Sequence, residues 1–151
     1  MRLEGSCHCG AVRFSVEAAH PAPFNLCVCS ICRKTAGGGG FGINLGASTK
    51  TLAVFGAEHV RRHEATENHQ RNFCGSCGSA LWGYSSSRPD LIHPFASAID
   101  RDLPVPPERT HMMLDHGVQW VEPQLEANDK TFAEYPDESL AVWYERTGMT
   151  R

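Results

Sequence analysis

The chain has 151 residues, a length typical of one domain. Its composition, with 41% hydrophobic and 21% charged residues, excludes intrinsic disorder as the main state, because enough apolar surface is present to form a core. The formal net charge of −3 argues against a protein that wraps nucleic acid, and no apolar run approaches the roughly 20 residues of a membrane-spanning helix.

Short apolar alternations predict a mainly β fold with tight turns. From Ala11 to Glu17, apolar and polar residues alternate, as in a strand with one buried face. Further strands are expected at residues 24–28, 41–45, 51–55, 79–84, 95–99 and 118–121. A short helix is expected to begin near Ser30 and to end at the glycines 37–40, and a second is expected near 138–144. No linker or repeat divides the chain, so residues 1–151 are interpreted as a single domain.

All seven cysteines fall in three tight clusters. The clusters are Cys7-x-Cys9, Cys27-x-Cys29-x-x-Cys32 and Cys74-x-x-Cys77. The N-terminus has no apolar segment of a secretory signal, so we expect a cytoplasmic, reducing environment. Disulfides are rare there, and closely spaced thiols point to metal binding.

The segment Cys74–Gly78 has the spacing of a structural zinc knuckle, in which a tight turn directs two sulfurs at one metal. A closed zinc site needs four ligands. Cys7 and Cys9, on a similar glycine-marked turn, are the natural source of the other two. Such a site would clip the N-terminal strand to the middle of the chain.

The remaining cluster, Cys27, Cys29 and Cys32, supplies three thiolates and would leave one coordination position open, as in catalytic zinc sites. The spacing alone does not decide between this interpretation and a structural site completed by a histidine from elsewhere. A redox Cys-x-x-Cys at residues 29 and 32 is a third interpretation, although the chain lacks the βαβ pattern of such motifs.

These clusters and their flanking residues resemble the glutathione-dependent formaldehyde-activating enzyme family, which also includes centromere protein V. The resemblance covers about residues 3–121 and leaves a C-terminal remainder. It is carried by Gly5-x-Cys7-x-Cys9-Gly10-x-Val12, Cys27-x-Cys29-Ser30-x-Cys32-Arg33-Lys34 and Phe73-Cys74-x-x-Cys77-Gly78-x-x-Leu81.

The resemblance implies several small antiparallel sheets around two zinc sites. It implies a structural zinc on Cys7, Cys9, Cys74 and Cys77, and a labile catalytic zinc on Cys27, Cys29 and Cys32. The implied activity is that of a carbon–sulfur lyase that joins glutathione and formaldehyde reversibly into S-(hydroxymethyl)glutathione, or acts on a related thiol adduct. The alternative is a non-catalytic zinc-binding structural or interaction module. No nucleic-acid or membrane partner is expected, and a chromatin role is the weakest interpretation.

Residues beside the second cluster are candidates for substrate binding. Arg33 and Lys34 are candidates to hold a carboxylate of a glutathione-like substrate, although a solvated helix end is the favoured interpretation. The glycines 37–40 are candidates for close backbone approach to a ligand, although a flexible turn is favoured.

The histidines and large aromatic residues receive mostly structural interpretations. His8 is expected to point away from the adjacent metal, and His59 and His63 are expected on the surface. A proton-shuttle or ligand role for His111 or His116 is a minor hypothesis. Core positions are favoured over substrate walls for three aromatic residues, Trp82, Phe95 and Trp120.

Overall fold

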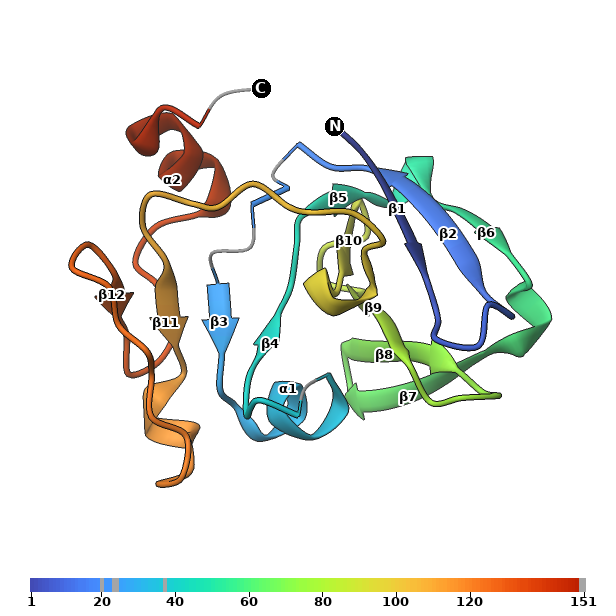
Figure 1. Ribbon diagram of the computed structural model, residues 1–151, viewed down its shortest axis with the longest axis horizontal. Coiled ribbons are helices and arrows are strands. Elements are labelled where there is room, and N and C mark those ends of the chain that lie inside the picture. Colours follow the sequence, from blue (N-terminus) through green and yellow to red (C-terminus); the bar gives the residue numbers. More distant parts are fainter. Residues whose placement is uncertain (20, 23–24, 37, 150–151) are drawn as a thin grey trace.

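The computed structural model describes residues 1–19, 21–22, 25–36 and 38–149, and it confirms a mainly β fold (Figure 1). The first sheet is antiparallel, in the order β1 (Arg2–Ser6), β2 (Arg13–Glu17) and β6 (Ala53–Phe55). The second is antiparallel, in the order β5 (Ala47–Ser48), β10 (Leu91–Pro94), β9 (Ala80–Ser85), β8 (His69–Cys74) and β7 (Val60–Thr66). The third is in the order β12 (Lys130–Thr131), β11 (Thr110–Met112), β3 (Asn25–Cys27) and β4 (Gly42–Ile43).

The third sheet is mixed, because β11 runs parallel to both β12 and β3. The two α-helices are α1 (Ser30–Thr35) and α2 (Leu140–Thr147). The four short 3-10 helices are η1 (Thr49–Thr51), η2 (Ala57–His59), η3 (Ala96–Ala98) and η4 (Leu114–His116). In Figure 1, α1 lies between the third sheet and the β7–β8 hairpin. No helix in the described part of the chain is long and apolar enough to cross a membrane.

The main core fills the space between the first two sheets. Phe14 on β2 and Trp82 on β9 meet there in a T-shaped contact with ring centroids 5.2 Å apart. Leu3, Leu81 and Phe95 are almost fully buried in the same cluster. Trp82 and Phe95 are therefore core residues, as the sequence predicts. Trp120 is not, because 67% of its surface is exposed.

Two of the expected strands are wrong. Within residues 95–99, Ala96–Ala98 form η3 and only the two flanking residues make isolated β-bridges. The Ala98 N–H donates to the Phe95 carbonyl at 2.9 Å, which closes the helical turn. Residues 118–121 form a turn closed by Val121 N–H and the Val118 carbonyl at 3.0 Å. The other expected strands each overlap an observed one, except that residue 24 lies outside the described residues. Both expected helices are present.

A buried carboxylate ties the segment after β11 to the third sheet. The Asp129 side chain is 2% exposed and accepts hydrogen bonds from the backbone N–H groups of Arg109 at 2.9 Å and Glu126 at 3.0 Å. The Arg109 guanidinium lies 3.0 Å from it and His111 Nε2 lies 3.2 Å from it. Burial opposes ionisation, but these hydrogen bonds outweigh it and hold the pKa of Asp129 well below its usual range.

We expect Asp129→Asn to lower the free energy of unfolding by about 2–4 kcal/mol near pH 7, because an amide leaves buried donors unpaired. The folded-state pKa lies below the unfolded value, so the carboxylate stabilises the fold above about pH 4 and this stabilisation is lost as the pH falls. Thermal unfolding between about pH 3 and pH 7 measures both effects. The matched control is Asp137→Asn on the surface, and an equal Tm for the Asp129 and Asp137 variants at pH 7 would contradict the prediction.

Candidate metal centres

Four cysteines from two distant turns meet at the ends of the first two sheets. The sulfurs of Cys7, Cys9, Cys74 and Cys77 all lie within 4.8 Å of one another. The Cys7 and Cys9 sulfurs are 3.5 Å apart, and those of Cys9 and Cys74 are 3.8 Å apart. Sulfurs bound tetrahedrally at about 2.3 Å from one zinc ion are about 3.8 Å apart. The cluster therefore has the donor set and the spacing of a closed tetrahedral site.

The two turns that carry these cysteines have the same backbone design. Gly10 N–H donates to the Cys7 carbonyl at 3.0 Å, and Gly78 N–H donates to the Cys74 carbonyl at 2.8 Å. Both glycines have φ = +77°, a conformation that side-chain-bearing residues rarely adopt. Each turn can therefore fold its two sulfurs to the same side.

Hydrogen bonds to two of the sulfurs, those of Cys7 and Cys77, favour their thiolate forms. Val12 N–H donates to Cys7 Sγ at 3.2 Å. The Ser79 hydroxyl lies 3.2 Å from Cys77 Sγ, and its hydrogen bond is the main cause that lowers the pKa of Cys77 to about 5. Ser79 Oγ also accepts from the backbone N–H of His8 at 3.0 Å, which links the two turns directly. Donors of this kind orient ligands around a bound metal.

The second cluster, hereafter the triad, consists of Cys27, Cys29 and Cys32. Their sulfurs lie within 4.8 Å of one another, and no other His, Cys, Asp or Glu of the described residues joins them. Cys27 ends β3, and Cys32 lies on the buried face of α1. Cys29 is the N-cap of α1, and its sulfur accepts the Cys32 N–H at 3.5 Å. Cys29 is the most accessible of the three, so the group is open on its side.

The three sulfurs share charge unequally. The hydrogen bond to Cys29 raises the pKa of Cys27, while hydrogen bonds from Cys27 and Cys32 lower the pKa of Cys29 far below its ordinary value. Hydrogen bonding within the triad therefore favours a thiolate at Cys29, which is also its most accessible member. Such a site attracts a thiophilic cation.

Two residues that the sequence analysis did not single out contact the triad. Arg71 Nη2 donates to Cys32 Sγ at 3.5 Å, and Asn44 Nδ2 lies 3.7 Å from the same sulfur. Arg71 belongs to β8 and Asn44 follows β4. No sequence signal marks either residue, because only the pairing of the strands brings them to α1.

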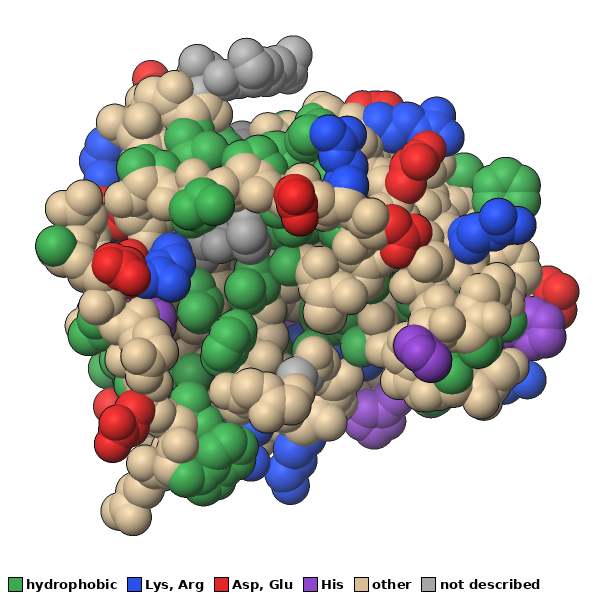
Figure 2. Space-filling model, viewed as in Figure 1, with side chains coloured by type: hydrophobic (Ala, Val, Ile, Leu, Met, Phe, Trp, Pro, Cys, Tyr) green, Lys and Arg blue, Asp and Glu red, His purple; other side chains and the backbone are tan. Residues whose placement is uncertain are grey.

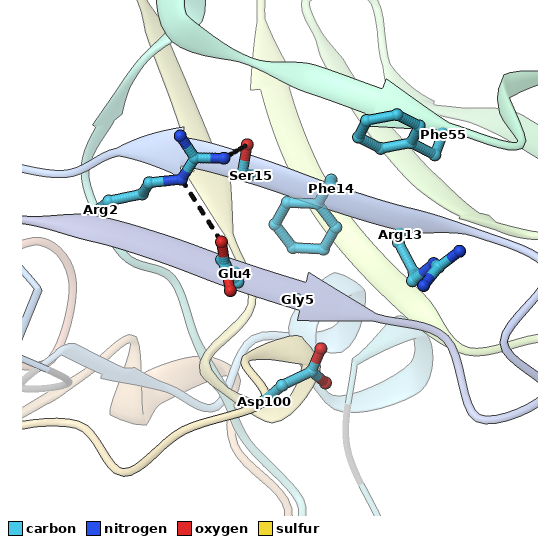
Figure 3. A pocket seen from close by; sticks show the side chains of 8 residues that line it. All are labelled: Arg2, Glu4, Gly5, Arg13, Phe14, Ser15, Phe55 and Asp100. Atoms are coloured by element: carbon cyan, nitrogen blue, oxygen red, sulfur yellow. Dashed lines mark hydrogen bonds and ion pairs between the residues drawn. The ribbon is translucent and has the colours of Figure 1, made fainter.

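Cavities of similar size lie at two places in the described part of the chain. One, of about 330 Å³, lies over β1 and β2 and contains none of the seven cysteines (Figure 3). Arg2, which lines this cavity, forms an ion pair with Glu4 at 3.4 Å and donates a hydrogen bond to the Ser15 hydroxyl at 3.1 Å. The other, of about 340 Å³, is also lined by none of the seven cysteines, but it is bounded by Arg71, by Thr35 of α1 and by Gly78, which directly follows Cys77. The second cavity thus lies between the two cysteine clusters.

The remaining candidates occupy varied positions. Lys34 is exposed and Arg33 is half-buried in the last turn of α1. A Cβ on Gly40, which has φ = +84°, would meet Val121 Cγ2, so packing explains at least this glycine of the run, while Gly37 lies outside the described residues.

Among residues 1–19, 21–22, 25–36 and 38–149, no histidine lies within hydrogen-bonding distance of either cluster of sulfurs. His8 and His63 are exposed, as expected for His63. His59 is partly buried, with 45% of its side chain exposed. His111 is buried against Asp129. His116 pairs with Glu134 at 2.9 Å, and this hydrogen bond raises the pKa of His116.

Comparisons with known proteins agree with the pattern of the clusters. The model of the glutathione-dependent formaldehyde-activating enzyme family matches residues 2–115. A Halomonas elongata protein, provisionally named as such an enzyme, is 56% identical over 154 residues, which cover 99% of this chain and 98% of the relative. A Rhodobacter sphaeroides protein of known crystal structure is 28% identical, with a TM-score of 0.57 and coverage of 68% of this chain and 92% of that one. The family match spans all seven cysteines, and the chain belongs to the glutathione-dependent formaldehyde-activating enzyme family.

Proposed function

We propose that the protein is a zinc-dependent carbon–sulfur lyase that acts on a glutathione–aldehyde adduct such as S-(hydroxymethyl)glutathione. The observation that carries this proposal is the contrast between the two clusters. One gathers four sulfurs, and the other gathers three with no fourth ligand among the described residues. Family membership adds glutathione and formaldehyde as the expected substrate chemistry. Seven free cysteines suit a reducing compartment such as the cytoplasm.

The residues would hold zinc in two roles. Cys7, Cys9, Cys74 and Cys77 would hold a structural ion, and the triad would hold a catalytic one. Zinc at the triad would supply a Lewis-acid position that makes a bound thiol more acidic or polarises an aldehyde oxygen.

The reaction requires few groups from the chain. In the joining direction, the thiol sulfur bonds to the carbonyl carbon and the thiol proton ends on the carbonyl oxygen. In the reverse direction the carbon–sulfur bond breaks and the hydroxyl proton returns to sulfur. Arg71 and Asn44 donate to Cys32 Sγ and thereby fix the inner edge of the triad. Cys29, on the outer edge, faces the side from which a substrate enters.

A chromatin role receives no support from the charge distribution. Acidic and basic side chains are interspersed on the face shown in Figure 2, and they form no broad basic field there. With a net charge of −3, the protein lacks the electrostatic attraction on which binding to a DNA backbone depends.

Native mass spectrometry during a glutathione titration tests the proposal. We expect two zinc ions per chain, one of which is released or acquires a bound glutathione as the thiol concentration rises. The same preparation should form S-(hydroxymethyl)glutathione faster than the uncatalysed mixture when formaldehyde is added. Two zinc ions indifferent to glutathione, without acceleration, would contradict the lyase and favour a structural module.

A further inference from the structure

Arg71 occupies an unusual position for a cation. It lies on β8 directly opposite Gly83 of β9, and a Cβ placed on Gly83 would come within 2.4 Å of Arg71 Nη1. The guanidinium therefore extends across the neighbouring strand, through space that only a glycine leaves free. Its carbon lies 5.6 Å from the centre of the buried Phe95 ring, which supports it from one side.

The charge of Arg71 is incompletely matched by the protein. Among the described residues, no carboxylate pairs with it, and its Nε is buried without a hydrogen-bond partner. Its one polar contact within these residues is the donation from Nη2 to Cys32 Sγ at 3.5 Å. Arg71 is half-buried, and a partly desolvated cation is stabilised by an anion, so a bound anion would supply the charge that the protein does not.

The same side chain forms a wall of the cavity of about 340 Å³ between the cysteine clusters. Thr35 lines the cavity from α1, three residues after Cys32, so the helix presents both residues on one face. His63 and Asn72 add further polar groups, and no Asp or Glu lines the cavity. A volume near the lower end of ligand sites suits one arm of a small molecule.

We propose that this cavity is the subsite for a carboxylate of the thiol substrate, and that Arg71 is the residue that selects it. The inference rests on the proposed function and deepens it, because Arg71 donates to the triad through Nη2 and also lines the cavity. A thiol whose sulfur is held at the triad would place a carboxylate arm beside the guanidinium. Thiols without a carboxylate would lack this contact and leave Arg71 unmatched.

A sulfur-free tripeptide tests the subsite apart from the reaction. The probe is γ-glutamyl-alanyl-glycine, which has both carboxylates of glutathione but cannot bind the triad through sulfur. Isothermal titration calorimetry with the metal-loaded protein should show binding that Arg71→Gln weakens roughly tenfold or more. Amidation of one of the two carboxylates should weaken binding to the wild type by a similar factor, and should have little further effect on the Arg71→Gln variant.

Further variants separate recognition from folding. Gly83→Ala retains Arg71 but displaces its guanidinium, so it should weaken binding of the tripeptide as Arg71→Gln does. Arg71→Lys keeps the positive charge but lacks the planar guanidinium, so it should weaken binding of the tripeptide less than Arg71→Gln does. Arg62→Gln removes an exposed arginine that pairs with Glu64 on β7, and should leave binding unchanged. Metal content and Tm of each variant verify that the fold and both clusters are retained.

The outcomes also separate this inference from the proposed function. No binding of the tripeptide to the wild type, or equal binding to the wild type and to the Arg71 and Gly83 variants, would overturn the subsite. Turnover of the glutathione adduct would leave the lyase intact in that case. Binding through Arg71 without any turnover would retain the subsite and overturn the lyase.

Discussion

Cys77→Ser is expected to abolish tight metal binding at the four-cysteine cluster and to destabilise the whole fold. The cluster joins the β1–β2 turn to the β8–β9 turn, so one lost ligand opens a connection between two sheets. Structural zinc sites contribute their binding energy to folding, and we expect the loss of at least about 3 kcal/mol. For a chain of this length, that loss lowers Tm by about 10 °C. Calorimetry and zinc analysis measure both effects.

The matched control is Ser76→Ala in the same turn. Ser76 is exposed, and its hydroxyl lies 3.4 Å from His59 Nδ1 without reaching a sulfur. This variant should keep its zinc and unfold within about 2 °C of the wild type. A Cys77→Ser protein that unfolds at the same temperature as Ser76→Ala would show that the cluster does not clip the two sheets.

Cys32→Ser should have the opposite profile, with loss of activity and retention of the fold. Removing a residue that hydrogen-bonds to a metal ligand typically lowers metal affinity or activity about 10–100-fold. Removing the ligand itself should therefore lower activity at least ~100-fold. The substitution is nearly isosteric, and the main core between the first two sheets does not include Cys32. We therefore expect only a small change in Tm, with zinc reduced from two ions to one.

Ser30→Ala, on the exposed first residue of α1 between two members of the triad, is the control for this experiment. It should retain both zinc ions and near-normal formation of S-(hydroxymethyl)glutathione. If Cys32→Ser instead unfolds as readily as Cys77→Ser, both clusters are structural, and the non-catalytic module replaces the lyase.

The parts of the fold that the sequence predicts are those with strong local signals. The alternation around Phe14 and Val16 marks β2, and Ser139 before an apolar helical pattern marks α2. Near α1 the signal is displaced by one residue, because Cys29 is the N-cap and Ser30 is the first helical residue. The cysteine spacings likewise predict which sulfurs meet, because turns of two or three residues determine the direction of each pair. The contact between Cys7–Cys9 and Cys74–Cys77 is long-range, and it is predicted because a closed zinc site needs four ligands.

The elements that the sequence does not reveal depend on tertiary context. β7 and β8 form the longest hairpin, yet most side chains of β7 are exposed and charged or polar, so no apolar alternation marks it. β11 is a buried three-residue strand held by parallel pairing with β3. Arg71 acquires its place from the register of β8 against β9, and Trp120 is exposed because its segment forms a turn. Neither outcome follows from residue type.

The different spacing of the two clusters along the chain has a consequence for how metal affects folding equilibria. The triad spans six consecutive positions, so a denatured chain can gather the same three sulfurs without any other structure. In the four-cysteine cluster, Cys9 and Cys74 are 65 positions apart and meet only once the sheets have formed. A ligand stabilises the native state only to the extent that it prefers that state over the denatured one. Free zinc concentration should therefore shift the unfolding equilibrium almost entirely through the four-cysteine cluster, and the triad can gain or lose its ion with little effect on whether the chain is folded.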